Sequence, residues 1–185
     1  MLPYKPILKN RREFQNGKRA WYLLHWAREK QIFTSPKIVA PQRSKINTFA
    51  YNEVPWFASA DVYFISAPNL EIKQAKYELK YLVAILNSKL YYHWFYHMGK
   101  RKGESLELLA TPLSETAIHD ATKLQKNELI NLVDEILILT QHADYMKDII
   151  KQENVKLLQQ QIDKLVYKIY ELTPEEIKYI ENTKF

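Results

Sequence analysis

Residues 76–98 read KYELKYLVAILNSKLYYHWFYHM, and this stretch decides where the central helices of the fold lie. Its apolar side chains recur every three or four residues, which is the spacing of one helix face. Asn87-Ser88 interrupts the pattern, which then resumes at Leu90. The stretch therefore predicts two consecutive helices, or one bent helix. The apolar residues that carry the pattern are Tyr77, Tyr81, Leu82, Ile85, Leu86, Leu90, Tyr91, Trp94, Phe95 and Met98.

Upstream of this stretch the chain alternates strand-like segments with breakers. Branched and aromatic residues favour strands, whereas Pro, Asn and Ser favour turns. The segments with strand composition are residues 20–26, 37–41, 48–51 and 60–66. Residues 1–19 are basic and contain Pro3 and Pro6, so we expect an extended arm that ends in a turn at residues 15–18.

Downstream of the stretch the pattern becomes helical. Residues 99–103, GKRKG, predict a short basic loop, and residues 106–110 predict a strand. Apolar stripes over residues 122–150 and 155–170 predict two helices that can pack as an antiparallel hairpin or a coiled coil. The sequence TPEE at residues 173–176 is a capping box with proline at the first helical position, so a short helix is expected over 174–182.

Composition excludes several classes of protein. The 185 residues are 46% hydrophobic and 13% aromatic, which is enough for a core. There is no cysteine, so disulfides, thiolate zinc sites and thiol nucleophiles are excluded, and we expect a reducing cytoplasmic location. None of the three glycines forms a phosphate-binding loop, so we expect no cofactor site in this chain. No apolar run is long enough to span a membrane, and we expect no signal segment.

Charge is distributed very unevenly along the chain. The first 45 residues contain eleven lysines and arginines against two acids, whereas residues 104–185 contain nine basic residues against fifteen acids. The formal net charge of +6 therefore understates the positive field at one end of the molecule. Such a field attracts a polyanion, and nucleic acid is the partner that it favours.

Polar and basic side chains in the arm and in two connecting segments are the candidate DNA contacts. Arginine can pair with guanine and glutamine with adenine, while serine and lysine suit phosphate oxygens. In isolation, residues 42–45 and 100–102 also fit a solvated strand end and a solvated loop, and the N-terminal charge excess favours the functional interpretation. The predicted DNA-binding residues are Lys9, Arg11, Arg12, Lys18, Arg19, Gln42, Arg43, Ser44, Lys45, Lys100, Arg101 and Lys102.

Three other constellations are weaker. His93 and His97 have the i, i+4 spacing of zinc ligands, but no glutamate or cysteine completes a site, so we expect no metal there. The aromatic run at residues 91–96 can stack on bases, although a packed helix face is the preferred interpretation.

The third constellation indicates a second alternative function, that of a magnesium-dependent nuclease. Asp61, Glu71 and Lys73 have the acid–acid–lysine order that some nucleases use to activate water, and Glu78 with Lys80 repeats part of it. Pro68 breaks the strand that should carry Glu71. We therefore assign no catalytic residue to this chain.

Four stretches together resemble a known family. They are Trp26 followed by FTSPKIV at residues 33–39, Phe57 followed by DVYFI at 61–65, YLVAILNSKL at 81–90, and IDKLVYKIYELTPEEI at 162–177. They resemble the TaqI-like C-terminal specificity domain of adenine-N6 DNA methyltransferases, and the last stretch also resembles the end of single-chain type II restriction–modification enzymes. The resemblance covers nearly the whole chain.

The resemblance implies a target recognition domain that reads a short duplex DNA sequence for a methyltransferase, and often a nuclease, on the same polypeptide. The Asn-Pro-Pro-Tyr and glycine-rich motifs of the methyltransferase are missing here, so S-adenosylmethionine and catalysis are expected in a separate domain. The expected fold is α+β, with a mixed, mostly antiparallel sheet flanked by helices and a C-terminal helical hairpin or coiled-coil extension. We divide the chain into a recognition domain at 1–121 and a helical extension at 122–185.

The predicted partners are double-stranded DNA and the methyltransferase domain of the same parent protein, with no membrane. The acidic helical tail leaves a first alternative open, in which the chain is a protein-interaction module and the tail docks a partner or forms a dimer. The nuclease above remains the second alternative.

Overall fold

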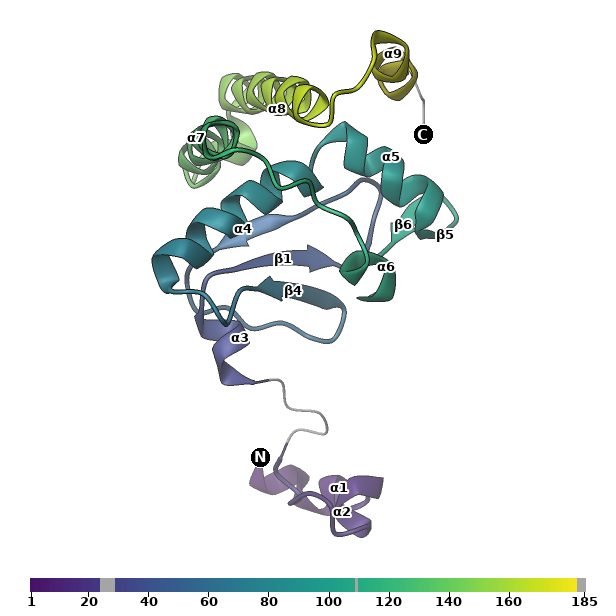
Figure 1. Cartoon of the computed structure of the whole chain (residues 1–185). Coiled ribbons are helices and arrows are strands. Elements are labelled where there is room, and N and C mark those ends of the chain that lie inside the picture. Colours follow the sequence, from purple (N-terminus) through teal and green to yellow (C-terminus); the bar gives the residue numbers. More distant parts are fainter. Residues whose placement is uncertain (24–28, 109, 183–185) are drawn as a thin grey trace.

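The computed structural model describes residues 1–23, 29–108 and 110–182 (Figure 1). Strands β1 (Lys37–Pro41), β3 (Ala50–Asn52) and β4 (Val62–Ser66) form a sheet in the order β3-β1-β4, with antiparallel pairing throughout. Successive side chains of a strand alternate between its faces. Ile38 and Ala40 of β1 accordingly share one face and enter the core beside Leu79 of helix α4 (Ile72–Leu86).

A second, smaller sheet continues from the first. It contains β2 (Arg43–Ser44), β6 (Ser105–Glu107) and β5 (Lys100–Lys102) in the order β2-β6-β5, again with antiparallel pairing. Gln42 lies between β1 and β2 and connects both sheets through its backbone. Its N–H donates to Asp61 O at 2.8 Å, and its carbonyl accepts from Leu108 N at 2.9 Å. The second sheet is therefore tied directly to the end of the first.

The break between the central helices lies where the sequence predicts it. Helix α4 ends at Leu86 and α5 spans Lys89–Met98. Ser88 closes one helix and opens the next, because its hydroxyl donates to Ile85 O at 2.7 Å and accepts from Tyr91 N at 3.3 Å. This is the N-cap arrangement that stabilises the first turn of a helix. Two helices, rather than one bent helix, are confirmed.

Two asparagines fasten the chain after β2 to this break. The Asn87 amide accepts from Phe49 N at 2.9 Å and donates to Phe49 O at 2.7 Å. Asn47 is buried, and its Nδ2 donates to Leu86 O at 2.6 Å and to Ser88 O at 3.0 Å. The carbonyls at a helix end need partners outside the helix. The segment that follows β2 supplies them and is held in place by doing so.

The C-terminal helices pack on the sheet domain. Helices α7 (Lys123–Thr140) and α8 (Ile149–Ile169) form a hairpin around the short 3-10 helix η2 (Tyr145–Lys147). Leu129 of α7 and Ile162 of α8 belong to the same buried core as the sheet residues above. In Figure 1 the hairpin lies against the face of α4 that points away from β1. The two predicted parts of the chain therefore share one hydrophobic core.

Helix α9 (Pro174–Asn182) begins with the predicted capping box. Thr173 N donates to Glu176 Oε2 at 2.8 Å, and Glu176 N donates to the Thr173 hydroxyl at 3.3 Å. A second capping box opens α7, where Thr122 and Gln125 bond reciprocally. The α+β class, with antiparallel sheets flanked by helices and a C-terminal helical hairpin, is confirmed. The strands form two small sheets instead of the single sheet that was expected.

The prediction of an extended N-terminal arm was wrong. Residues 1–19 contain η1 (Leu2–Tyr4), α1 (Lys5–Lys9) and α2 (Arg12–Gln15). Pro3 and Pro6 fall in first helical turns, where the missing N–H of proline is harmless. The turn before Lys18 is present, with Gly17 at φ +67°.

Other element boundaries also differ from the predictions. The strand expected over 20–26 is absent from residues 20–23, and residues 24–26 lie outside the described part. Helix α3 (Lys30–Thr34) was not predicted. The expected loop at 99–103 is strand β5 with its turn, and the strand expected over 106–110 is the earlier and shorter β6 followed by α6 (Ala110–Ser114). Helix α7 ends before the predicted residue 150, and α8 begins before 155.

None of the helices in the described ranges combines the length and apolar character needed to cross a bilayer.

Replacing Asn87 with alanine should destabilise the fold. The variant Asn87→Ala leaves the N–H and carbonyl of buried Phe49 without their partners, which should lower the free energy of unfolding by about 1–3 kcal/mol. Urea denaturation monitored by circular dichroism measures this change. The matched control is Asn154→Ala on the exposed side of α8, which should change stability by no more than about 0.5 kcal/mol. Equal effects of the two changes would contradict the proposed role of Asn87.

Candidate nucleic-acid interface

The β2-β6-β5 sheet, called the basic sheet below, brings together two basic segments that are far apart in the sequence. Arg43 of β2 and Lys100 of β5 both lie opposite Glu107 of the central strand β6. In the next register position, Ser44 and Arg101 both lie opposite Leu106. Residues 43–44 and 100–102 therefore form a single surface, as the prediction of a common DNA-binding face requires.

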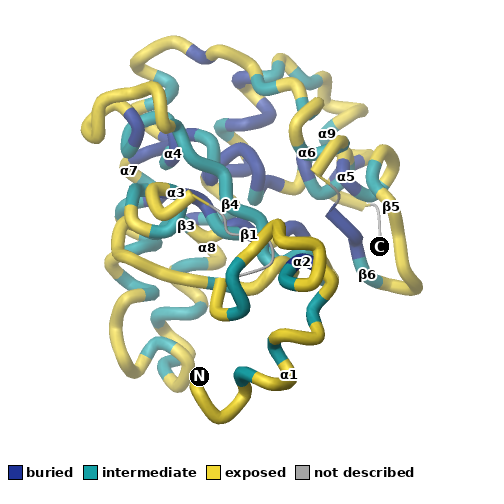
Figure 2. Tube along the Cα trace, turned by 90° about the horizontal axis from the view of Figure 1, so that it is seen from below, coloured by how far each residue is buried: buried dark blue, intermediate teal, exposed yellow. Residues whose placement is uncertain are grey.

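The two faces of the basic sheet differ in character. Leu106 is only 2% exposed, so its face of the sheet is directed toward the core. Alternation places Arg43, Glu107 and Lys100 together on the opposite face. Lys100, Arg101 and Lys102 are all exposed, and Figure 2 shows the exposed β5 beside the more buried β6. The sheet thus presents an edge strand made entirely of cations.

Glu107 binds the arginine that was predicted to read a base. The Arg43 Nε and Nη2 atoms donate to Glu107 Oε1 at 2.9 and 2.6 Å, and Lys100 Nζ lies 3.7 Å from Oε2. The Glu107 side chain is 7% exposed, whereas that of Arg43 is 51% exposed. The Arg43 guanidinium, through its hydrogen bonds and its charge, holds the pKa of Glu107 below its ordinary value. The charges of Lys100 and Lys102 lower this pKa further. The carboxylate is therefore ionised and fixed at neutral pH.

Two tyrosines of α5 lie beside the cations. The Arg101 guanidinium carbon is 4.0 Å from the centroid of the Tyr96 ring, and the same guanidinium donates to the Tyr96 hydroxyl. The Tyr92 and Tyr96 rings meet edge to face at 6.3 Å. The Tyr92 hydroxyl donates to Lys45 O at 3.4 Å. Arg101 is thus stacked in a defined position, and the backbone after β2 contacts the same aromatic pair.

The other residues of the segment 42–45 have partly structural roles. The Ser44 hydroxyl donates to Ile46 O, which shapes the turn after β2. Gln42 is half-buried and connects the two sheets through its backbone, while Lys45 is exposed. Of these residues, Lys45 has the side chain best placed to meet a ligand.

The N-terminal cations do not join the basic sheet. Figure 1 shows α1 and α2 below α3, apart from β5 and β6. Within this N-terminal part, Arg12 Nε lies 3.2 Å from Glu13 Oε1, and Lys9 Nζ lies 5.9 Å from the centroid of the Phe14 ring. The arm therefore lies apart from the surface formed by the two segments, and contact of its cations with DNA stays a prediction. The residues concerned are Lys9, Arg11, Arg12, Lys18 and Arg19.

A family comparison indicates what the basic sheet belongs to. The family of the TaqI-like C-terminal specificity domain matches residues 7–115. The chain belongs to this family. All strands of the basic sheet lie inside the matched range. No curated protein shows significant similarity to the chain.

As a TaqI-like specificity domain, the chain is a DNA-sequence specificity domain of the kind found in restriction–modification enzymes, and DNA is its ligand. This agrees with an exposed cationic strand, because affinity for DNA comes largely from contacts with phosphates. The match ends before α7, yet α7 and α8 complete the core on which the matched part is built.

Sequence reasoning missed Glu107 in this specificity domain, and it considered Tyr92 and Tyr96 only as members of the aromatic run at residues 91–96. A usable signal was present for Glu107. Gly103-Glu104 is a two-residue hairpin turn with Gly103 at φ +63°, and glycine at its first position is typical of a type II′ turn. Counting outward from that turn pairs Lys100 with Glu107. No comparable local signal identifies the tyrosines, because their placement depends on how α5 meets β5.

The alternative nuclease residues are not brought together. Asp61 precedes β4, whereas Glu71 is the N-cap of α4 and Lys73 lies in its first turn, so a strand and a turn separate Asp61 from the other two. Five residues of extended strand span roughly 17 Å. A shared magnesium ion needs carboxylates within a few ångströms of each other. The geometry therefore does not support the nuclease alternative.

The histidine pair belongs to an aromatic contact between helices. The ring centroids of His93 and His97 are 4.4 Å apart, and Tyr179 of α9 packs edge-on against His93 at 5.3 Å. Within the described residues, no three His, Cys, Asp or Glu side chains are grouped so that they could hold a metal ion. Tyr91 and Phe95 of the aromatic run are buried in the core, as the preferred interpretation requires.

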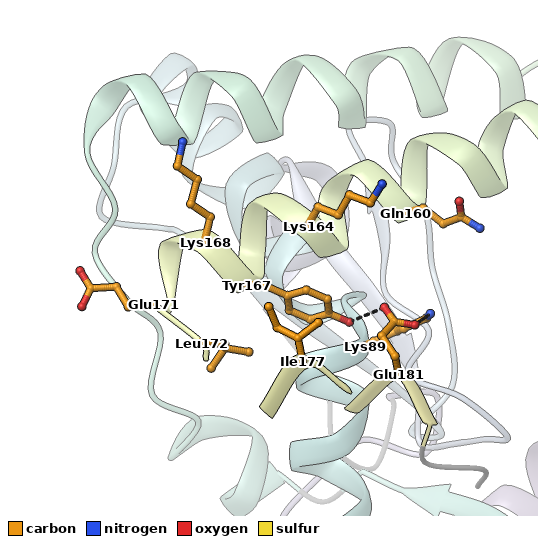
Figure 3. A pocket seen from close by; sticks show the side chains of 9 residues that line it. All are labelled: Lys89, Gln160, Lys164, Tyr167, Lys168, Glu171, Leu172, Ile177 and Glu181. Carbon is orange, nitrogen blue, oxygen red and sulfur yellow. Dashed lines mark hydrogen bonds and ion pairs between the residues drawn. The ribbon is translucent and has the colours of Figure 1, made fainter. Parts of the chain in front are cut away.

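A cavity of about 730 Å³ lies between α8, α9 and the start of α5 (Figure 3). Lys89 and Glu181 form an ion pair in it, and the Tyr167 hydroxyl donates to Glu181 Oε1 at 2.9 Å. In Figure 3, Lys164 and Lys168 point away from this pair. The polar groups at the centre of the cavity thus bind one another and hold α9 against α5.

The Arg43–Glu107 ion pair should make stability depend on pH. Because the pKa of Glu107 is lowered in the folded state, the ion pair stabilises the fold above the ordinary carboxyl value of about 4.3. That contribution is lost as the pH falls through the lowered pKa. The difference in unfolding free energy between the wild type and Glu107→Gln should therefore be larger at pH 7 than at pH 3, as measured by urea denaturation. When Arg43 is also replaced with alanine, the effect of Glu107→Gln on the unfolding free energy should differ less between pH 7 and pH 3. A difference that stays constant with pH would contradict the ion pair.

Proposed function

We propose that this chain reads a short duplex DNA sequence for an adenine-N6 DNA methyltransferase of a restriction–modification system, to which it is joined in one polypeptide. The observation that carries the proposal is the family match over residues 7–115, which contains the whole basic sheet. We assign the contact with DNA to this sheet and to Lys45, which follows β2. The N-terminal helices add positive charge near the duplex without belonging to the same surface.

The shape of the basic sheet suits the major groove. That groove is about 12 Å wide in B-DNA and admits a two-stranded β-ribbon. The β5–β6 hairpin supplies two such strands, with β2 beside β6, and its outer strand carries Lys100, Arg101 and Lys102. Lysines on this strand meet phosphates and release counterions, and this sets register without reading sequence. Arg43, on the other side of β6, is the candidate for a base edge.

Methylation is the work of the partner domain in this proposal. Among the 185 residues there is neither an Asn-Pro-Pro-Tyr motif nor a glycine-rich cofactor loop. S-adenosylmethionine would bind the methyltransferase domain, which would also extrude the target adenine from the duplex. The specificity domain holds the duplex in register meanwhile.

Selection from a randomised duplex pool tests the proposal. The chain is mixed with the pool at two salt concentrations, and the bound DNA is sequenced. We expect enrichment of one short motif and affinity that falls steeply with salt, because several phosphates are neutralised. Binding without enrichment would remove the specificity role. No binding at low salt, together with a stable oligomer in sedimentation, would favour the protein-interaction alternative through the α7–α8 hairpin.

The cationic edge strand should contribute to affinity without contributing to sequence preference. The variant Lys102→Ala, which leaves the contact between Lys100 and Glu107 in place, should weaken binding to the selected motif and to a scrambled duplex by the same factor. It should also reduce the slope of log affinity against log salt by about 1, because this lysine neutralises one phosphate. The matched control is Lys156→Ala, an exposed lysine of α8. If the control lowers the slope equally, β5 does not contact the duplex.

A further inference from the structure

We propose that Glu107 is a positioning residue for base reading, which holds the Arg43 guanidinium so that its free end meets a guanine in the DNA target. This inference rests on the proposed function and assigns a specificity-determining role to a residue that itself touches no DNA. It also names the base that Arg43 would read.

The donors of Arg43 divide between Glu107 and the solvent side. A guanidinium has five N–H donors, one on Nε and two on each Nη atom. Glu107 Oε1 accepts one from Nε and one from Nη2, at 2.9 and 2.6 Å. The two forward-pointing donors, one on each Nη atom, remain as a fork at the end of the side chain. That fork matches the O6 and N7 acceptors of guanine, which no other base presents together in the major groove.

The burial of Glu107 excludes direct contact with a base. Its side chain is 7% exposed, and its second oxygen faces Lys100 Nζ at 3.7 Å. The carboxylate is thus held from both sides by its cross-strand neighbours and is not available to accept from a cytosine amino group. Arg43 is half exposed. The arginine can therefore reach the groove while its partner cannot.

An acid at this position is unexpected if the sheet only binds phosphates. One carboxylate between Arg43 and Lys100 reduces the local positive potential and so weakens non-specific binding. The same carboxylate restricts an arginine side chain that would otherwise lose its rotamer entropy on binding. Fixing one geometry before binding favours ligands that match it. The arrangement thus lowers general affinity and raises discrimination.

The backbone around Glu107 is rigid enough for this role. Strand β6 is the central strand of the basic sheet, with β2 on one side and β5 on the other. The neighbouring Leu106 and Leu108 are 2% and 4% exposed and anchor the strand in the core. Leu108 N also donates to Gln42 O at 2.9 Å, next to Arg43. The carboxylate and the arginine therefore keep their relative position.

Four variants of the full chain test the inference, with binding measured on the selected motif and on motifs with its guanines changed one at a time. Glu107→Gln should reduce the preference for one guanine about tenfold, while binding to scrambled duplex becomes tighter because a negative charge is lost. Glu104→Gln is the matched control, since it removes the same charge from an exposed position on the same hairpin. It should tighten binding to all duplexes alike and leave the preference unchanged.

A double-mutant cycle separates positioning from a structural effect. Arg43→Ala should abolish the preference for that guanine, and adding Glu107→Gln to it should cause no further loss, because Glu107 acts through Arg43. The unfolding free energy of each variant is measured alongside. A purely structural role predicts lower stability with an unchanged preference, and this outcome would overturn the inference.

The proposed function and the inference fail in distinguishable ways. If the wild type enriches no motif, both are overturned. If the wild type enriches a motif and Glu107→Gln keeps the same preference as Glu104→Gln, the inference alone is overturned. The inference alone is also overturned if Arg43→Ala leaves the preference for every guanine of the motif unchanged.

Discussion

The paired hydrogen bonds between the Asn87 amide and the backbone of Phe49 are the constraint on which the rest of the structure depends. They join the break between α4 and α5 to the segment that follows β2. At the same break, Ser88 caps α5 and Asp163 of α8 accepts the Lys89 N–H at 2.8 Å. Two central helices, the helical hairpin and the segment that follows β2 thus meet at three consecutive positions, residues 87–89. The direction of α5, and with it the place of β5, is set there.

Features with strong local signals could be predicted from the sequence. The break at Asn87-Ser88, the strand at 37–41 and the capping box at Thr173 all depend on residues that lie close together in the sequence. The N-terminal helices could not be separated from an extended arm, because proline is tolerated in a first helical turn as well as in an irregular segment. Strand β5 has the composition of a solvated loop, and only pairing with β6 makes it a strand.

The candidate site likewise contains residues that could be predicted from the sequence and residues that could not. Charge and composition identified the cations at residues 43, 45 and 100–102, because an excess of positive charge needs no tertiary contact to be visible. Charge alone also included the cations of the N-terminal helices, which lie elsewhere. Glu107 was not identified, because the hairpin turn at Gly103-Glu104 indicates its pairing with Lys100 but gives no indication of the distant Arg43. Its importance comes from register: the residue opposite it on one side is Arg43, and on the other side Lys100.

That register also defines which pieces of this domain can be exchanged between relatives. Arg43 and Glu107 lie on strands separated by most of the specificity domain, yet they form one row of the basic sheet. A graft of the β5–β6 hairpin alone would place a foreign residue against the native arginine, and a graft of the β2 segment alone would do the reverse. The smallest transferable unit is therefore discontinuous, and consists of the β2 segment together with the hairpin. In a lineage that changes its target sequence, the two segments should change together.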